Sequence, residues 1–108
     1  MKTLASMKCV ACKGGMPPLK GNEIQYFLRH IKGWIVVKQH HIEKEYKFPD
    51  FKSTLRFVNK IGKIAEKEGH HPNIDFTYGK AKITLYTHKI NGLHENDFIV
   101  AAKIDSLL

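Results

Sequence analysis

Histidines are the residues whose number and spacing most clearly predict chemistry in this chain. Seven occur among 108 residues, and two of them stand together as His70-His71-Pro72. Gly69 ends the preceding helical pattern and Pro72 restricts His71 to extended backbone, so this bend presents both imidazoles. His88 closes a run of alternating residues opposite the apolar positions, so it faces solvent or a cleft. Because imidazoles titrate near neutral pH, several of them in one cleft predict proton transfer on a small molecule.

A metal site is the alternative use of these histidines, and the pattern does not favour it. The sequence has no His-Glu-x-x-His motif and no cysteine cluster beside them. Its two cysteines, Cys9 and Cys12, form a lone Cys-x-x-Cys without the further ligands of a zinc site or the strand-to-helix context of a thioredoxin site. We interpret that pair as a surface turn with reduced thiols, zinc shared with a distant histidine being the weaker alternative. The pattern therefore predicts no metal site. The remaining histidines are expected on the surface: His30, His40, His41 and His94.

Apolar spacing predicts the elements that position these residues. A helical stripe begins after Asn22 and stops at Gly33, and a longer one runs from Phe51 to Gly69. Alternating or β-branched stretches predict four strands, and a further helical pattern closes the chain. The predicted strands are residues 34–40, 42–48, 73–78 and 81–87, the last two joined by a tight turn at Gly79-Lys80, and the final helix is 97–108.

The element order is therefore α-β-β-α-β-β-α, which predicts an α+β fold. The economical arrangement is a four-stranded antiparallel sheet with three helices packed on one face, since each helix needs an apolar surface to cover its stripe. The length supports one domain and excludes a second core. We place the domain at residues 21–108 and interpret residues 1–20, with their glycines and prolines, as an irregular N-terminal arm.

The net charge of the chain is compatible with several classes of anionic partner and does not identify one. Lysines and arginines number 18 against 10 acids, a formal net charge of +8. Only Arg29 and Arg56 are arginines, and the lysines are scattered among acids, which disfavours nucleic acid as the primary partner. No apolar run approaches the roughly 18 residues of a membrane span, and the first residues lack a signal-peptide pattern. We expect a cytoplasmic protein with no membrane partner.

One multi-part pattern is specific enough to indicate a family. It reads Glu66-x-x-x-His70-His71-Pro72, with Tyr78 after a gap of five residues, His88 after nine more and Asp97 after eight more. This pattern resembles the pterin-4a-carbinolamine dehydratases, also known as 4a-hydroxytetrahydrobiopterin dehydratases.

The resemblance extends from Gly21 to Asp105 and departs at one position. At His94 the family usually has Ser or Thr as a helix N-cap, so His94 is expected to cap poorly. Asp97, three residues later, is then open to two interpretations. It is either an acid favoured by the helix dipole or a residue of the site.

The resemblance implies a lyase that dehydrates 4a-hydroxytetrahydropterin to quinonoid dihydropterin in tetrahydropterin recycling, without metal or organic cofactor. It implies His70 as general acid, aided by the helix end and Glu66, and His88 as acceptor of the N5 proton. His71 would then hold the pterin, and Asp97 or Glu66 would orient a histidine.

The resemblance also implies a homodimer or homotetramer. It leaves two other functions open: a protein-binding regulatory module that acts as a dimerisation cofactor, and a dehydratase-like protein for another pterin.

Overall fold

A four-stranded antiparallel sheet with strand order β1-β2-β4-β3 is the base of the computed structural model, which describes residues 3–10 and 14–108. The main elements follow in the predicted order, which confirms the α+β class and the α-β-β-α-β-β-α arrangement. They are α1 (Gly21–Leu28), β1 (Ile35–Val37), β2 (His41–Lys47), α2 (Phe51–Glu68), β3 (Asn73–Thr77), β4 (Lys80–Leu85) and α3 (Glu95–Asp105). Two short 3₁₀ helices, η1 (Leu4–Ser6) and η2 (His88–Ile90), complete the described chain.

Strand alternation divides the sheet into an apolar face and a polar face. In β4, Ala81, Ile83 and Leu85 are fully buried, whereas the residues between them are half-exposed. β4 lies between β2 and β3, so these three side chains form the floor of the core. β1 is shorter than predicted, because Lys38 and Gln39 both take left-handed backbone angles and turn the chain into β2.

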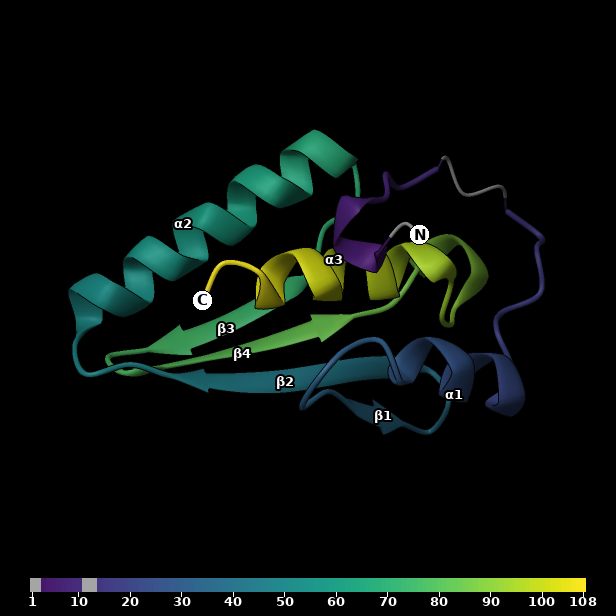
Figure 1. Cartoon of the computed structure of the whole chain (residues 1–108), viewed down its shortest axis with the longest axis horizontal. Helices are drawn as coiled ribbons and strands as arrows, with labels where there is room; N and C mark the ends of the chain where they lie inside the picture. The colour runs from purple at the N-terminus through teal and green to yellow at the C-terminus, as the bar shows by residue number, and fades with distance from the viewer. Residues whose placement is uncertain (1–2, 11–13) are drawn as a thin grey trace.

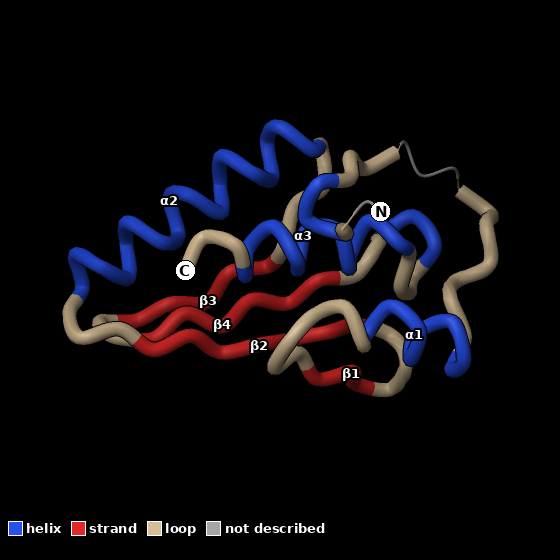
Figure 2. Tube along the Cα trace, viewed as in Figure 1, coloured by secondary structure: helices blue, strands red, loops and turns tan. Residues whose placement is uncertain are grey.

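The helices cover the apolar face. α2 and α3 lie over the sheet, and α1 packs beside them against α3, where Phe27 stacks on Phe98 with 5.4 Å between ring centroids (Figures 1 and 2). α3 is buried on nearly every side and not along one stripe, because it lies between the sheet, α2 and the N-terminal segment. Its central position makes α3 the element around which the core is built.

Part of the predicted irregular arm packs on the domain. Leu4–Ser6 form η1, which contacts α3, and Leu4 is buried in the core. Apolar periodicity could not reveal so short an element. The division between residues 20 and 21 stays a prediction.

Capping residues set the ends of α2. The Asp50 side chain accepts a hydrogen bond of 2.8 Å from the Ser53 N–H at the start. At the other end Gly69 takes a φ of 66°, the left-handed cap that the sequence predicts. This turn directs the chain out of the helix directly before His70.

Gly62 inside α2 and Gly69 at its C-terminal cap should therefore respond oppositely to substitution by alanine. Gly69→Ala forces a side chain into the left-handed region, so the free energy of unfolding should fall by about 1 kcal/mol. Gly62→Ala lies inside the helix where the added methyl meets no atom within 4 Å, so stability should rise by roughly 0.5 to 1 kcal/mol. Urea denaturation of both variants checks this, and equal shifts of the same sign would contradict it.

Candidate active site

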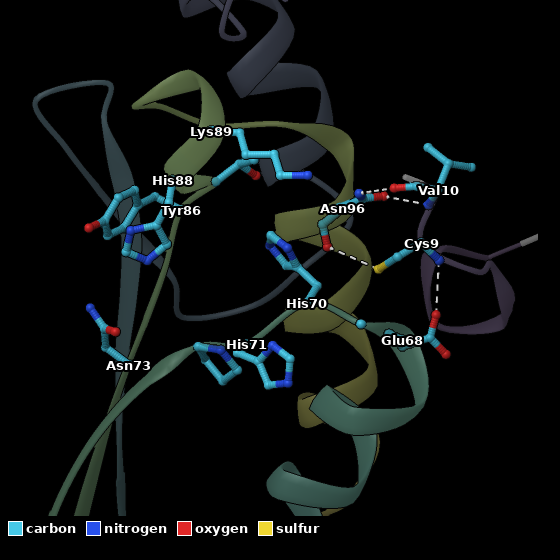
Figure 3. A pocket seen from close by; sticks show the side chains of 13 residues that line it. Cys9, Val10, Glu68, His70, His71, Asn73, Tyr86, His88, Lys89 and Asn96 are labelled. Carbon is cyan, nitrogen blue, oxygen red and sulfur yellow. Dashed lines mark hydrogen bonds between the residues drawn. The ribbon is translucent and has the colours of Figure 1, made fainter. Parts of the chain in front are cut away.

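The three histidines singled out from the sequence line one pocket. His70, His71 and His88 surround a cavity of about 640 Å³ at the end of α2, the start of β3 and the segment after β4 (Figure 3). The sequence did not predict several other lining residues, which come from four parts of the chain: Cys9 and Val10, Glu68, Asn73, and Tyr86 and Lys89. The pocket is thus built from segments far apart in the sequence.

His70 is held by a buried carboxylate. Its Nε2 lies 2.5 Å from Asp97 Oδ1, and the Asp97 side chain is fully buried. The carboxylate also accepts hydrogen bonds of 2.9 Å from the Thr87 hydroxyl and from the His94 N–H. Since a carboxylate accepts, His70 must donate from Nε2, which leaves its Nδ1 available for proton exchange with a bound molecule.

His94 caps α3, contrary to the expectation that it would be a poor N-cap. Its Nδ1 accepts a hydrogen bond of 3.0 Å from the Asn96 N–H, while Asp97 accepts from the His94 N–H. The imidazole nitrogen thus accepts the hydrogen bond that a Ser or Thr oxygen would accept at this position. Asp97 accepts within the capping box and also contacts His70, so its position is compatible with both interpretations, and its part in the site stays a prediction.

Glu66 contacts His71 and not His70, so the expected help of Glu66 to His70 is not seen. His71 Nε2 lies 2.5 Å from Glu66 Oε2, with side chains 60% and 79% exposed respectively. Water screens this pair, so it orients His71 with little net energy. His71 is therefore the solvent-facing member of the adjacent pair, and His70 the enclosed one.

His88 lies in η2, just beyond β4, which ends at Leu85. Its exposed ring packs on Tyr86 with 4.2 Å between centroids, and His40 packs on Tyr86 at 4.5 Å. His40 Nε2 also lies 2.9 Å from Asn91 Oδ1, at the end of η2. His40 therefore contacts residues on both sides of His88 in the sequence. It is half-buried, whereas the sequence predicted a surface position.

The opposite wall is the N-terminal segment. The Cys9 N–H donates to Glu68 Oε1 at 2.9 Å, and burial together with the Glu68 carboxylate raises the pKa of the Cys9 thiol to about 12. Cys9 is therefore a neutral, half-buried thiol in a wall of the pocket. Cys12 lies outside the described residues, so the Cys-x-x-Cys interpretation stays a prediction.

Two features are absent from the described residues. Within residues 3–10 and 14–108 no group of three or more His, Cys, Asp or Glu side chains is arranged to hold a metal ion. No helix of that part of the chain is long and apolar enough to cross a membrane.

Tyr78, a member of the sequence pattern, lies exposed at the β3–β4 turn and does not line the pocket.

Comparison with known proteins was made by sequence and by structure. The family described as pterin 4 alpha carbinolamine dehydratase matches residues 17–107. A protein of Rubrobacter xylanophilus named "Putative pterin-4-alpha-carbinolamine dehydratase" is 50% identical over 107 residues, 99% of this chain and 100% of its own. A protein of the same name from Rickettsia canadensis is 50% identical over 107 residues, 98% of each chain.

Two solved structures are similar as well. The transcriptional coactivator/pterin dehydratase from Brucella melitensis has a TM-score of 0.79 and 33% identity, covering 83% of this chain and 97% of its own. A pterin dehydratase-like protein described as a RuBisCO assembly factor in the alpha-carboxysome has a TM-score of 0.61 and 26% identity, covering 69% of this chain and 88% of its own.

The Glu68 carboxylate should make stability depend on pH. Its hydrogen bond from the Cys9 N–H, helped by Lys103, lowers the pKa of Glu68 below its ordinary value of 4.5. The folded state thus binds this proton more weakly than the unfolded state, so Glu68 stabilises the fold above pH 4.5. That contribution is lost as the pH falls through the lower folded pKa.

The pH dependence is tested by urea denaturation of the parent chain and of Glu68→Gln, each at pH 7 and at acid pH. The variant should be less stable than the parent at pH 7, and the difference should shrink on acidification. Glu66→Gln removes the same charge from an exposed position of α2 and should have the smaller effect. Parallel pH profiles for the parent chain and Glu68→Gln would contradict the assignment.

Proposed function

Because the chain belongs to the pterin 4 alpha carbinolamine dehydratase family, we propose that it dehydrates 4a-hydroxytetrahydropterin to quinonoid dihydropterin. The observation that carries the proposal is the convergence of His70, His71 and His88 on one pocket, with His70 bonded to a buried carboxylate. The reaction belongs to tetrahydropterin recycling and needs neither metal nor organic cofactor.

The reaction breaks two bonds, C4a–O and N5–H, and forms two, an O–H bond of the leaving water and the second C4a–N5 bond. The C4a–O bond breaks as the hydroxyl gains a proton and leaves as water, and N5 loses its proton as the C4a=N5 double bond forms. An acid and a base must therefore face adjacent atoms of the same bound ring. The proton accepted from N5 balances the proton given to the hydroxyl, so the enzyme ends the cycle unchanged after exchange with solvent.

His70 is assigned as the acid and His88 as the base. The buried Asp97 carboxylate is an ion-pair partner for a protonated His70, which delivers its proton from Nδ1. His88 is exposed on the facing wall, with its ring supported by Tyr86, and takes the N5 proton. His71, whose Nε2 lies against Glu66, holds the pterin through a hydrogen bond at its other ring nitrogen, Nδ1. Asp97 and Glu66 are thus positioning residues.

Replacing either proton-transfer group should lower turnover strongly. His70→Ala and His88→Ala should each reduce kcat by about 10²- to 10⁴-fold, the usual contribution of general acid–base catalysis. The measurement is the decay of the 4a-carbinolamine absorbance after its chemical generation. His30→Ala is the matched control, since His30 is exposed and lies outside the pocket.

Near-normal kcat in both pocket variants would overturn the assignment. The parent chain is assayed with and without EDTA, and activity that survives chelation supports the metal-free reaction. Loss of activity with EDTA would favour a metal enzyme instead.

Asp97→Asn should separate positioning from folding. An amide can still accept from the Thr87 hydroxyl and the His94 N–H, but it cannot form an ion pair with His70. We expect kcat to fall by about tenfold or more with a changed pH profile, because His70 loses its fixed tautomer. A merely structural role would lower the melting temperature and leave the pH profile of kcat unchanged.

A protein-binding role is the second candidate. It is supported by the solved relatives, one described as a transcriptional coactivator and one as an assembly factor. Such a role would use exposed apolar positions of α2 such as Phe51 and Leu55, away from the histidine pocket. It predicts that the His70 and His88 variants keep partner binding, whereas a dehydratase loses turnover in both.

Membership of the family also supports a proposal on the oligomeric state and the cellular location. We propose a homodimer or homotetramer in the cytoplasm, and the two outer strands β1 and β3 are the edges available for pairing between copies. The exact pterin is the remaining variable, and a dehydratase for another pterin would use the same histidines. Size-exclusion chromatography and assays with several pterins distinguish these cases.

A further inference from the structure

An N-terminal segment outside the family match forms one wall of the pocket. The match begins at residue 17, yet Cys9 and Val10 line the cavity. We call residues 3–10 the N-terminal strap. In Figure 3 the labelled strap residues lie across the pocket from Tyr86 and His88, with His70 between them.

The first attachment of the strap is Asn96, at the start of α3. Its Oδ1 accepts from the Val10 N–H at 3.0 Å, and its Nδ2 donates to the Val10 carbonyl at 2.7 Å. The side chain therefore pairs with Val10 as a neighbouring strand would. Asn96 is only 3% exposed, so its amide would lose both partners in a part-buried position if Val10 moved away, which is costly.

A second attachment is formed by Glu68 and Lys103. Glu68 accepts from the Cys9 N–H through one oxygen, and Lys103 Nζ lies 3.7 Å from the other. Lys103 also donates to the Ala5 carbonyl at 2.9 Å. Leu4, at the other end of the strap, is buried in the core. The strap is thus fixed at both ends and along its length.

Both attachments are next to the groups that position His70. Asn96 directly precedes Asp97, which bonds to His70, and Glu68 is two residues before His70 on the last turn of α2. The strap and the histidine therefore share the same two helix ends. A segment that only stabilised the domain would not need its backbone at the rim of the pocket.

We propose that the N-terminal strap is part of the substrate site, where Cys9 and Val10 contact the bound pterin outside its reacting C4a–N5 bond. The inference rests on the proposed function, since it names a wall of that same site. The strap offers a neutral thiol and an apolar side chain, which suit a flat, uncharged heterocycle. Its contacts are made equally before and during the reaction, so they contribute to KM and not to kcat.

Protection of the Cys9 thiol tests the contact directly. In a Cys12→Ser background Cys9 is the remaining cysteine, and its modification by N-ethylmaleimide is followed by mass spectrometry. Saturation with 7,8-dihydrobiopterin, verified by calorimetry, should slow the modification by about threefold or more, because a bound ligand removes the reagent's access. An unchanged rate at verified saturation overturns the proposal and leaves the proposed function standing.

A charge placed on the strap supplies the second readout. Val10→Asp should raise KM by about fivefold, equivalent to losing about 1 kcal/mol of apolar contact, with kcat within about twofold of the parent value. Met16→Asp is the matched control, since Met16 is exposed, lies on the same arm and does not line the pocket. Equal KM values in the parent and Val10→Asp overturn the inference. Absence of any pterin binding by the parent chain overturns the proposed function and the inference together.

Discussion

A fully buried carboxylate is the constraint that organises this structure. Burying the charge of Asp97 is costly unless its oxygens are hydrogen-bonded, and three segments supply the donors: the bend after α2, the segment after β4 and the start of α3. The carboxylate therefore holds together the parts of the chain that carry His70 and His88. In the described chain no buried side-chain nitrogen or oxygen lacks a partner, so this polar centre is fully satisfied within a largely apolar core.

The same constraint makes the three imidazoles chemically unequal. His70 is enclosed and bonded to a buried anion, whereas His71 is paired with an exposed Glu66 and His88 is exposed with its ring on Tyr86. A dehydration needs one group that gives a proton and another that takes one, and identical environments would not separate these roles. The difference in burial thus supports the proposed division of acid and base roles between His70 and His88.

The sequence predicted those parts of the fold that depend on local pattern. Spacing and residue type predict the apolar stripe of α2, the left-handed cap at Gly69 and the buried residues of β4. Most points that the sequence did not reveal involve contacts between residues distant in sequence. Examples are the bonds of Asn96 with Val10 across 86 positions and of Glu68 with Cys9 across 59. No periodicity encodes such pairs, and His94 failed as a prediction because an imidazole is an uncommon cap.

The N-terminal strap extends this reasoning to the boundary of the family match. A core element of a fold is detectable by its repeated apolar spacing, but residues 3–10 have none and are held by polar side chains of α2 and α3. Relatives at 50% identity align over almost the whole chain, so the strap falls within the length that they share with it. Since Asn96 and Glu68 flank the residues that position His70, a loosened strap would disturb the pocket wall and the helix ends together. The N-terminal strap, despite its lack of regular pattern, therefore belongs to the physical unit that forms the pocket.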